Sequence, residues 1–130
     1  MSQDLNQVAP AAPPAPQLWR WKSGRQASGY ETLPLAFSKR FRFDCYLIRY
    51  RQGAGIPPHR DSAPAGTRHY RLNLILWPAR KGGELACESY LFRLGPLKFF
   101  RPDLAKHAVS PVEAGVRYVF SVGWLRGART

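Results

Sequence analysis

Short apolar runs, each ended by glycine or proline after a few residues, recur along the chain from Phe43 onward. Branched and aromatic side chains dominate these runs, and both kinds favour strands over helices. The pattern predicts strands over Phe43–Arg51, Tyr70–Trp77, Glu84–Arg93, Leu97–Phe100, His107–Val112 and Val116–Leu125. About seven or eight short strands in roughly 110 residues, with no internal repeat, are typical of a sandwich, jelly roll or barrel. The sequence therefore predicts a mainly β fold with few or short helices.

The first part of the chain departs from this pattern. Residues 1–17 include Val-Ala-Pro-Ala-Ala-Pro-Pro-Ala-Pro, a run without large side chains in which the prolines oppose both helix and sheet. We therefore expect a flexible tail over residues 1–17. One folded domain is expected over residues 18–130, since a chain of this length has no room for a second core. A short helix is considered between Gly29 and Lys39, and Pro34 counts against it.

Composition narrows the class of protein. Hydrophobic residues make up 45% of the chain and aromatic residues 13%, which is enough apolar material to form a core. The sequence has no run of about 20 apolar residues, as a membrane helix requires, and no basic region followed by an apolar run at its N-terminus. We therefore expect no membrane contact and a cytoplasmic location, in which Cys45 and Cys87 are buried, reduced thiols.

The chain is strongly basic, with 20 Lys and Arg against 8 Asp and Glu and a formal net charge of +12. A field of this sign attracts polyanions, so nucleic acid is a candidate partner, although many basic proteins are simply soluble. The densest basic cluster in the sequence comprises Lys39, Arg40, Arg42, Arg49 and Arg51. Trp19, Trp21 and Trp124 are expected to be core or lid residues rather than platforms on which bases stack.

A candidate metal site begins at His59-Arg60-Asp61. In an extended segment, residues two apart project to the same side, so this imidazole and carboxylate can share one cation. His107, at the predicted start of a strand, can supply a third ligand. Two imidazoles and one carboxylate leave three positions open on an octahedral ion, which favours non-haem Fe(II) and oxygen chemistry over structural zinc. Taken singly, each residue also fits a polar loop or strand edge, and His69 is expected to be exposed at a strand start.

The order of motifs around these residues is more specific than any one motif. The stretch Tyr50-Arg-Gln-Gly-Ala-Gly-Ile-Pro-Pro-His-Arg-Asp61 is followed by Tyr70-Arg-Leu-Asn-Leu-Ile-Leu-Trp77, by Gly82-Gly-Glu-Leu85, and by Arg117 at 10 residues after His107. Over roughly residues 43 to 126 this order resembles the 2-oxoglutarate/Fe(II) dioxygenase superfamily, particularly its prolyl-hydroxylase-like branch. The resemblance implies a double-stranded β-helix, a cupin-like jelly roll, with Fe(II) bound by His59, Asp61 and His107.

The same resemblance assigns the co-substrates and the residues that bind them. It implies that 2-oxoglutarate and O2 join Fe(II) in the site. The Arg117 guanidinium would grip the distal carboxylate of 2-oxoglutarate in a bidentate pair. Tyr50 is expected to donate a phenolic hydrogen bond to the co-substrate. Ser121 lies on the same strand face as Arg117, and Asn73 is expected to replace a hydroxyl group that relatives carry on the central strand.

The predicted function is a dioxygenase that hydroxylates a C–H bond, and two classes of substrate remain open. The resemblance favours a protein side chain or peptide, whereas the net charge favours nucleic acid or a nucleotide. Val119, Ser121 and Gly123 stand where the nucleic-acid demethylase branch has Asn, Thr and Arg, which argues against membership of that branch. The alternative is a non-catalytic metal-binding jelly-roll module that binds nucleic acid. Because little sequence precedes the first core strand, a homodimer or another partner is also considered.

Overall fold

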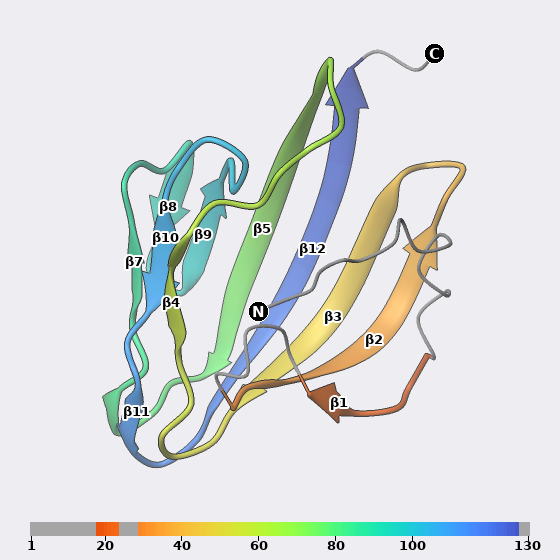
Figure 1. The fold of residues 1–130 in the computed structure, drawn as a ribbon. Coiled ribbons are helices and arrows are strands. Elements are labelled where there is room, and N and C mark those ends of the chain that lie inside the picture. The colour runs from red at the N-terminus through yellow and green to blue at the C-terminus, as the bar shows by residue number, and fades with distance from the viewer. Residues whose placement is uncertain (1–17, 24–28, 128–130) are drawn as a thin grey trace, which may run out of the picture.

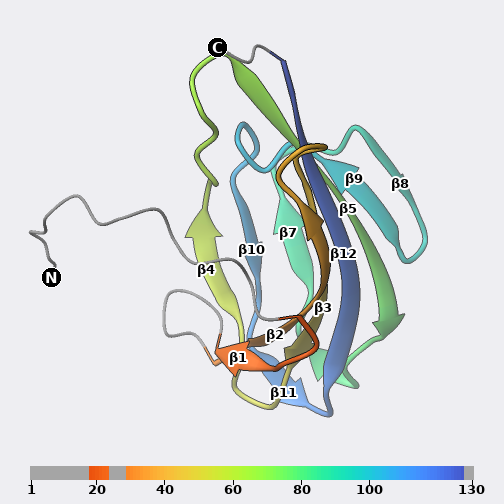
Figure 2. The same ribbon diagram turned by 90° about the vertical axis from the view of Figure 1, so that its right-hand side faces the viewer.

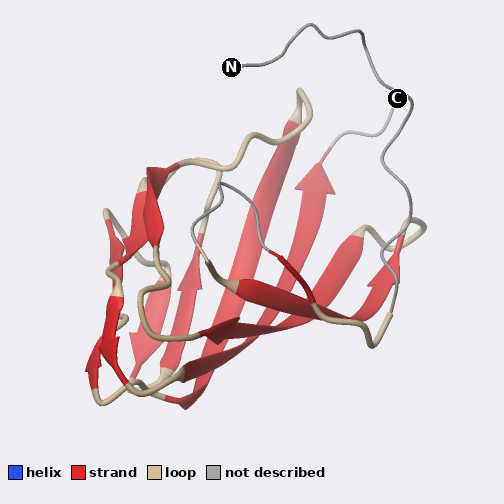
Figure 3. Cartoon of the chain, turned by 60° about the horizontal axis from the view of Figure 1, so that its bottom comes forward, coloured by secondary structure: helices blue, strands red, loops and turns tan. Residues whose placement is uncertain are grey.

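The computed structural model describes residues 18–23 and 29–127, and within these ranges it contains strands and no helix (Figure 3). The predicted mainly β fold is confirmed. The tail expected over residues 1–17 lies outside the described residues. None of the described segments is a helix long and apolar enough to cross a membrane.

The described residues form twelve strands, and every pairing between them is antiparallel. The strands are β1 (Lys22–Ser23), β2 (Glu31–Ser38), β3 (Phe43–Tyr50), β4 (Ile56–His59), β5 (Thr67–Trp77), β6 (Lys81–Gly82), β7 (Leu85–Cys87), β8 (Phe92–Leu94), β9 (Leu97–Phe100), β10 (His107–Val109), β11 (Val112–Ala114) and β12 (Arg117–Gly127). A large sheet has the order β1-β2-β3-β12-β5-β9-β8, a small sheet has the order β4-β10-β7, and β11 pairs with β6.

The chain passes back and forth between the two main sheets. Strands β3, β5, β9 and β12 belong to the large sheet, and the intervening β4, β7 and β10 belong to the small one (Figure 1). This alternation is the winding of a double-stranded β-helix. The two sheets lie as separate layers when the molecule is viewed from the side (Figure 2). The predicted jelly roll is therefore confirmed at the level of topology.

The core lies between the layers. Buried and half-buried positions alternate along β12, so that Arg117, Val119, Ser121 and Gly123 face inward. The cluster of buried apolar residues consists of Tyr50, Ala54, Val109, Val112 and Val119. It combines residues of both sheets and of the turn after β3, which fixes the start of β12 against β10 and β11.

The short helix considered between Gly29 and Lys39 is wrong, because this segment forms β2. Strand β2 pairs with β3, and the register shifts between Pro34 and Ala36. A bulge of this kind accommodates a residue that cannot donate to the ladder. The Pro34 carbonyl oxygen still accepts a hydrogen bond from the Trp19 amide at 2.7 Å. Pairing with a neighbouring strand therefore overrides the weak local preference of the segment.

Two predicted strands are each divided in the structure. The segment Glu84–Arg93 becomes β7 and β8, because the Glu88 amide bonds to Lys106 in the small-sheet region whereas the Leu91 amide bonds to Phe99 of the large sheet. The segment His107–Val112 becomes β10 and β11 around Pro111, which has no amide hydrogen to donate. The prediction for Leu97–Phe100 is confirmed to the residue.

The long strands β3, β5 and β12 define two ends of the molecule. At one end Arg117 is the Cα partner of Tyr50, and we call this the lower end, as it is drawn in Figure 1. At the other, upper end, β12 runs beside the start of β5, where Leu125 is the Cα partner of His69.

Candidate metal centre

The structure brings the three predicted metal ligands together. His59 ends β4 and Asp61 follows it, while His107 opens β10, and the two histidines are Cα partners in the small sheet. His59 Nε2 lies 3.2 Å from Asp61 Oδ1, and His107 Nε2 lies 3.9 Å from Asp61 Oδ2. One ligand atom from each residue lies within 4.8 Å of the other two. Three side chains far apart in the sequence can therefore reach a single cation.

Each imidazole is oriented by a hydrogen bond from its other ring nitrogen. His59 Nδ1 donates to the Pro57 carbonyl oxygen at 2.9 Å, and His107 Nδ1 donates to the Ala105 carbonyl oxygen at 2.9 Å. Because a carbonyl oxygen only accepts, both Nδ1 atoms carry the hydrogen and both Nε2 atoms keep a lone pair when the rings are neutral. Hydrogen bonds of this kind hold the rings of metal-binding histidines in place.

Burial also favours the neutral form of His107. This side chain is 8% exposed, and burial lowers the pKa of its imidazole. The hydrogen bond to Ala105 and the charge of Asp61 oppose that shift without reversing it. A neutral imidazole is the form that binds a metal.

The segment that carries His59 and Asp61 is tied to the segment that precedes His107. The Asp61 amide donates to the Pro102 carbonyl oxygen at 2.8 Å. Between the two ligands, Arg60 Nε donates to the Leu104 carbonyl oxygen at 2.9 Å, and its Nη2 donates to Glu88 Oε1 at 3.1 Å. The ligands are therefore held by contacts that do not use their metal-binding atoms.

The donor set fits non-haem iron. Two neutral imidazoles and one carboxylate on one side of an octahedral ion leave three positions for other ligands. Structural zinc prefers four protein ligands, often including cysteine. Among the described residues, the group of three formed by His59, Asp61 and His107 has no cysteine member. The site is thus open in the way that oxygen chemistry requires.

Arg117 is a buried cation at the lower end. It is 3% exposed, and none of the described carboxylates lies within ion-pairing distance of it. Its guanidinium carbon lies 4.9 Å from the centre of the Tyr50 ring. Burial raises the pKa of the Tyr50 hydroxyl to about 12, although the charge of Arg117 opposes the rise. A buried guanidinium with no carboxylate partner is suited to binding an anion.

Ser121 and Asn73 lie apart from Arg117 and bind each other. The Ser121 hydroxyl donates to Asn73 Oδ1 at 2.6 Å and accepts from Arg71 Nη1 at 2.7 Å. Arg71 Nη2 in turn donates to Asp44 Oδ1 at 2.7 Å. Ser121 is four residues from Arg117 on an extended strand, about 13 Å along β12. The two pairs therefore cannot grip one carboxylate together, and the role predicted for Ser121 and Asn73 in co-substrate binding stays a prediction.

Sequence reasoning missed the Arg71–Asp44 pair inside the barrel. The available signal was strand alternation, which places Arg71 on the same face as Asn73. Gly123, the Cα partner of both Arg71 and Asp44, leaves room for this pair, because a Cβ at Gly123 would lie 2.0 Å from Arg71 Nη2. The expectation that His69 is exposed is wrong. His69 is half-buried within β5, with its Nε2 3.4 Å from Arg71 Nη2, and burial lowers the pKa of its imidazole.

Other single-residue expectations have mixed outcomes. Trp124 is half-buried and stacks with Tyr70 and Phe99 at centroid distances of 6.0 and 5.7 Å. Trp19 is 68% exposed, so it is not a core residue. Cys45 and Cys87 are free thiols as predicted, but both are half-buried rather than buried.

Comparisons with known proteins agree with this geometry. The 2OG-Fe(II) oxygenase superfamily matches residues 45–126. A prolyl-4-hydroxylase from Pseudomonas putida is 26% identical with a TM-score of 0.51, over 67% of this chain and 52% of that one. The viral collagen prolyl hydroxylase vCPH of Paramecium Bursaria Chlorella virus-1 is 22% identical with a TM-score of 0.50, over 67% of this chain and 60% of that one.

The fold extends to proteins of lower identity. The cupin domain of Schizosaccharomyces pombe Cnp3 is 11% identical with a TM-score of 0.57, over 82% of this chain and 69% of that one. The search of curated proteins gave no match. The chain spans between half and two thirds of the two hydroxylases to which it is similar. The match over residues 45–126, which include all three candidate ligands, places this chain in the 2OG-Fe(II) oxygenase superfamily, with structural similarity to its prolyl-hydroxylase-like members.

Proposed function

We propose that this chain is an Fe(II)- and 2-oxoglutarate-dependent dioxygenase that hydroxylates a C–H bond. The observation that carries the proposal is the convergence of two oriented imidazoles and one carboxylate, with ligand atoms within 4.8 Å of one another. Membership of the superfamily supports the same chemistry. When bound, Fe(II) would hold 2-oxoglutarate and O2, so that 2-oxoglutarate is oxidised to succinate and CO2 while one oxygen atom enters the substrate C–H bond.

The residues of the chain would bind and orient 2-oxoglutarate. Arg117 offers a planar pair of N–H donors for the distal carboxylate, and its burial places that pair away from water, where charge-assisted hydrogen bonds are strong. The Tyr50 hydroxyl has a pKa of about 12, so it keeps its hydrogen at neutral pH and can donate to the same carboxylate. Val119 and Val112 provide apolar walls that exclude water.

The similarity and the charge of the chain favour different substrates. The two similar hydroxylases are named for proline, and one of them for collagen, so the similarity favours a peptide that contains proline. The net charge of +12 favours a polyanion instead. Both substrate classes are compatible with the metal centre, so the chemistry can be tested before the substrate is known.

The test is an anaerobic titration of the protein with Fe(II) and 2-oxoglutarate. We expect the weak visible absorption band of an iron-bound 2-oxo acid, and release of succinate when air is admitted. His59→Ala should abolish the band, because it removes one ligand. His69→Ala is the matched control, since His69 is the one histidine of the chain outside the ligand set, and it should keep the band. Absence of both band and succinate from the wild-type protein would leave the non-catalytic module as the better description.

A further inference from the structure

Five basic side chains gather at the upper end of the large sheet, and we call this group the basic rim. Ser38 and Phe43 are Cα partners that close the β2–β3 hairpin, and the Leu125 amide of β12 donates to the Arg42 carbonyl oxygen in the hairpin turn at 3.0 Å. The end of β12 and the start of β5 lie together at the same end of the molecule (Figure 1). The basic rim consists of Lys39, Arg40, Arg42, Arg68 and Arg126.

The structure divides the basic cluster that the sequence indicated. Arg49 and Arg51 lie toward the lower end of β3, where both donate to Glu31 at 2.8 and 2.9 Å. They are therefore already neutralised in part. Arg68 and Arg126 belong to the basic rim instead of Arg49 and Arg51. Both are distant from the β2–β3 hairpin in sequence but lie at the same, upper end of the large sheet.

Little negative charge compensates the basic rim. Within residues 18–23 and 29–127, no carboxylate lies within ion-pairing distance of Lys39, Arg42, Arg68 or Arg126. Asp44, which follows the first residue of β3, is engaged by Arg71 at 2.7 Å. The rim thus presents cations to solvent, with Lys39, Arg68 and Arg126 exposed.

Two local features of the basic rim disfavour the folded state when no ligand is bound. Arg68 and Arg126 are Cα partners on neighbouring antiparallel strands, and like charges directly opposite each other are destabilising. Arg42 has a φ of 59°, in the left-handed region that residues other than glycine adopt with some strain. The first of these features becomes favourable if an anion lies between the two guanidinium groups. A bound phosphate would relieve the repulsion between Arg68 and Arg126.

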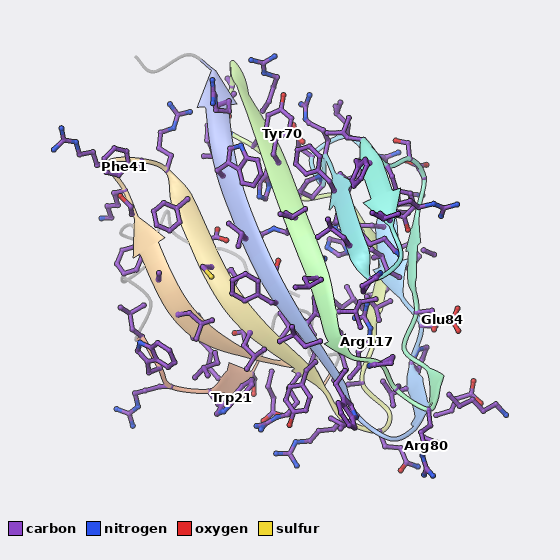
Figure 4. The ribbon with its side chains drawn as sticks, turned by 180° about the vertical axis from the view of Figure 1, so that it is seen from behind. Trp21, Phe41, Tyr70, Arg80, Glu84 and Arg117 are labelled. Carbon is purple, nitrogen blue, oxygen red and sulfur yellow. The ribbon has the colours of Figure 1, made fainter. Side chains whose placement is uncertain are left out.

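An aromatic side chain projects from the same rim. Phe41 at the hairpin tip is 71% exposed, and the Arg40 guanidinium lies 5.5 Å from the centre of its ring. Figure 4 shows Phe41 at this end of the sheet, far from Arg80 at the opposite end. Exposed aromatic rings among arginines are the usual elements of surfaces that bind single-stranded nucleic acid, because the cations follow the backbone and the ring stacks on a base.

The start of β5, which carries Arg68, is connected to the segment that holds the metal ligands. Arg68 is followed by His69, whose side chain is half-buried and lies with its Nε2 3.4 Å from Arg71 Nη2. The His69 amide donates to the Asp103 carboxylate. The neighbouring residue, Pro102, accepts a hydrogen bond from the Asp61 amide through its carbonyl oxygen. Because side chains alternate along a strand, Arg68 and Arg126 lie on the outer face of the large sheet, so a polymer bound there reaches the metal centre only by passing over the upper end of β5.

We propose that the basic rim binds the phosphate backbone of a single-stranded nucleic acid, with Phe41 stacked on a base. That this polymer is also the substrate rests on the proposed dioxygenase function. An acidic peptide would satisfy the cations but has no flat base for Phe41. A single strand is favoured over a duplex because stacking on Phe41 requires an unpaired base.

The first experiment measures binding of a fluorescent 12-nucleotide single-stranded DNA to the full chain by anisotropy, from 50 mM to 500 mM KCl. Each phosphate contact contributes about −0.7 to the slope of log K against log salt, so five contacts give roughly −3.5. The Arg68→Gln/Arg126→Gln variant should have a slope of roughly −2 and should bind roughly 50-fold more weakly at 50 mM, if the lines converge near 1 M.

The matched control removes two charges at the opposite end. Arg80→Gln/Lys81→Gln changes the net charge by the same amount, through exposed residues of the lower end. It should bind nearly as well as the wild-type chain. Equal weakening by both double variants would mean that net charge alone attracts DNA, and this result would overturn the proposal.

The second experiment separates nucleic acid from acidic peptide. Phe41→Ala should weaken binding of the normal oligonucleotide about fivefold or more and leave binding of an abasic oligonucleotide unchanged, because stacking needs a base. A glutamate peptide of equal charge should bind more weakly than the oligonucleotide and should not respond to Phe41→Ala. Equal binding of peptide and oligonucleotide, with no effect of Phe41→Ala, would overturn the nucleic-acid assignment in favour of an acidic peptide.

The binding assay and the turnover assay fail separately. Binding is measured without 2-oxoglutarate, so it does not depend on catalysis. Succinate release is then measured with and without the oligonucleotide. DNA binding without any succinate would uphold the basic rim and contradict the proposed enzyme. The opposite result is also possible. If succinate is released without stimulation by the oligonucleotide, and both double variants bind DNA equally, the proposed enzyme would be upheld and the basic rim contradicted.

Discussion

At the scale of single residues, Arg117 gives the most specific indication of the ligand, which must be an anion. A buried guanidinium that no described carboxylate neutralises is unfavourable in the free protein, and replacing a buried charge by an apolar group of similar length is often stabilising. The same change should remove most of the affinity for a dianion. An apolar substitution of Arg117 should therefore weaken binding of the dianion without lowering the stability of the fold.

We expect Arg117→Met to raise the KM for 2-oxoglutarate by at least about 30-fold, since loss of one partner of a buried charge pair weakens binding by about 2 kcal/mol or more. Arg117→Lys should have a smaller effect because it keeps the charge but loses the fork. Arg80→Ala, at an exposed site, is the control and should leave this KM unchanged. The measurement is succinate release against 2-oxoglutarate concentration.

Unfolding in urea without 2-oxoglutarate completes this test. Arg117→Met should be at least as stable as the wild-type chain, because none of the described carboxylates pairs with the buried cation. A clear loss of stability, with the KM unchanged, would show that Arg117 is a structural residue and not a ligand of the co-substrate.

The three candidate metal ligands could be grouped from the sequence, and the structure brings them together. His59 and Asp61 are two apart on an extended segment, so strand geometry alone brings their side chains to one side, and His107 joins them because β10 pairs with β4. Arg71 and Asp44 were missed because nothing in the sequence around either residue identifies the other as its partner. Their contact depends on the order of β3, β12 and β5 in the sheet and on the space left by Gly123.

At the scale of elements, the pairing of β12 with β5 places Arg126 opposite Arg68. We expect Arg126→Glu to raise the free energy of unfolding by about 1 kcal/mol at low salt, because a cross-strand repulsion becomes an attraction. Arg80→Glu changes the net charge equally and should raise it by less. Urea unfolding at 20 mM and 500 mM KCl is the measurement, and a gain that persists unchanged at high salt would contradict the electrostatic cause.

The edge of the large sheet has the opposite arrangement of charge. Glu31 of β2 accepts hydrogen bonds from Arg49 and Arg51 of the neighbouring strand and turn, and these bonds lower the pKa of its carboxyl from 4.5 to about 2. Arg49 also lies over the Trp21 ring at 3.9 Å. Because the pKa is lowered in the folded state, the stabilisation is complete above pH 4.5 and is lost as the pH falls toward 2.

Glu31→Gln should therefore lower the free energy of unfolding by about 1 kcal/mol at pH 7, a value that allows for solvent screening of this partly exposed group. The difference from the wild-type chain should shrink between pH 4.5 and pH 2. Thermal unfolding of both proteins across this range is the measurement. A difference that stays constant with pH would show that packing, rather than the ionised carboxylate, is responsible.

Element boundaries were the least predictable part of the fold. Alternation indicates that Glu84–Arg93 is extended, but it does not show that the chain leaves the small sheet after Cys87 and enters the large one at Phe92. The same holds for β2, whose strand form comes from pairing with β3 and not from its own sequence. Local pattern thus predicts extended structure, whereas the sheet to which a segment belongs is decided by contacts far along the chain.

At the scale of the whole molecule, the carboxylates are nearly all in use. Among the described residues, Glu31, Asp44, Glu88, Asp103 and Glu113 each form an ion pair with Lys or Arg. These carboxylates pair with Arg49, Arg51, Arg60, Arg71, Lys81 and Arg101, whereas the whole chain carries 20 basic residues and only 8 acidic ones. The folded state therefore holds an excess of positive charge in a small volume, and self-repulsion of this kind opposes the compact state. The homodimer considered from the sequence stays a prediction.

This excess predicts how stability depends on salt. Between 20 mM and 300 mM KCl we expect the Tm to rise by about 5 °C, because ions that shorten the screening length weaken the net repulsion more than they weaken the few ion pairs. Removing four cations with Arg68→Gln, Arg80→Gln, Lys81→Gln and Arg126→Gln lowers the net charge from +12 to +8 and should reduce this rise. Chloride is preferred to sulfate, since sulfate also strengthens apolar burial. A Tm that falls with KCl would mean that ion pairs such as Glu31–Arg49 outweigh the repulsion. In that case the cations of the basic rim would need no polyanion to offset them.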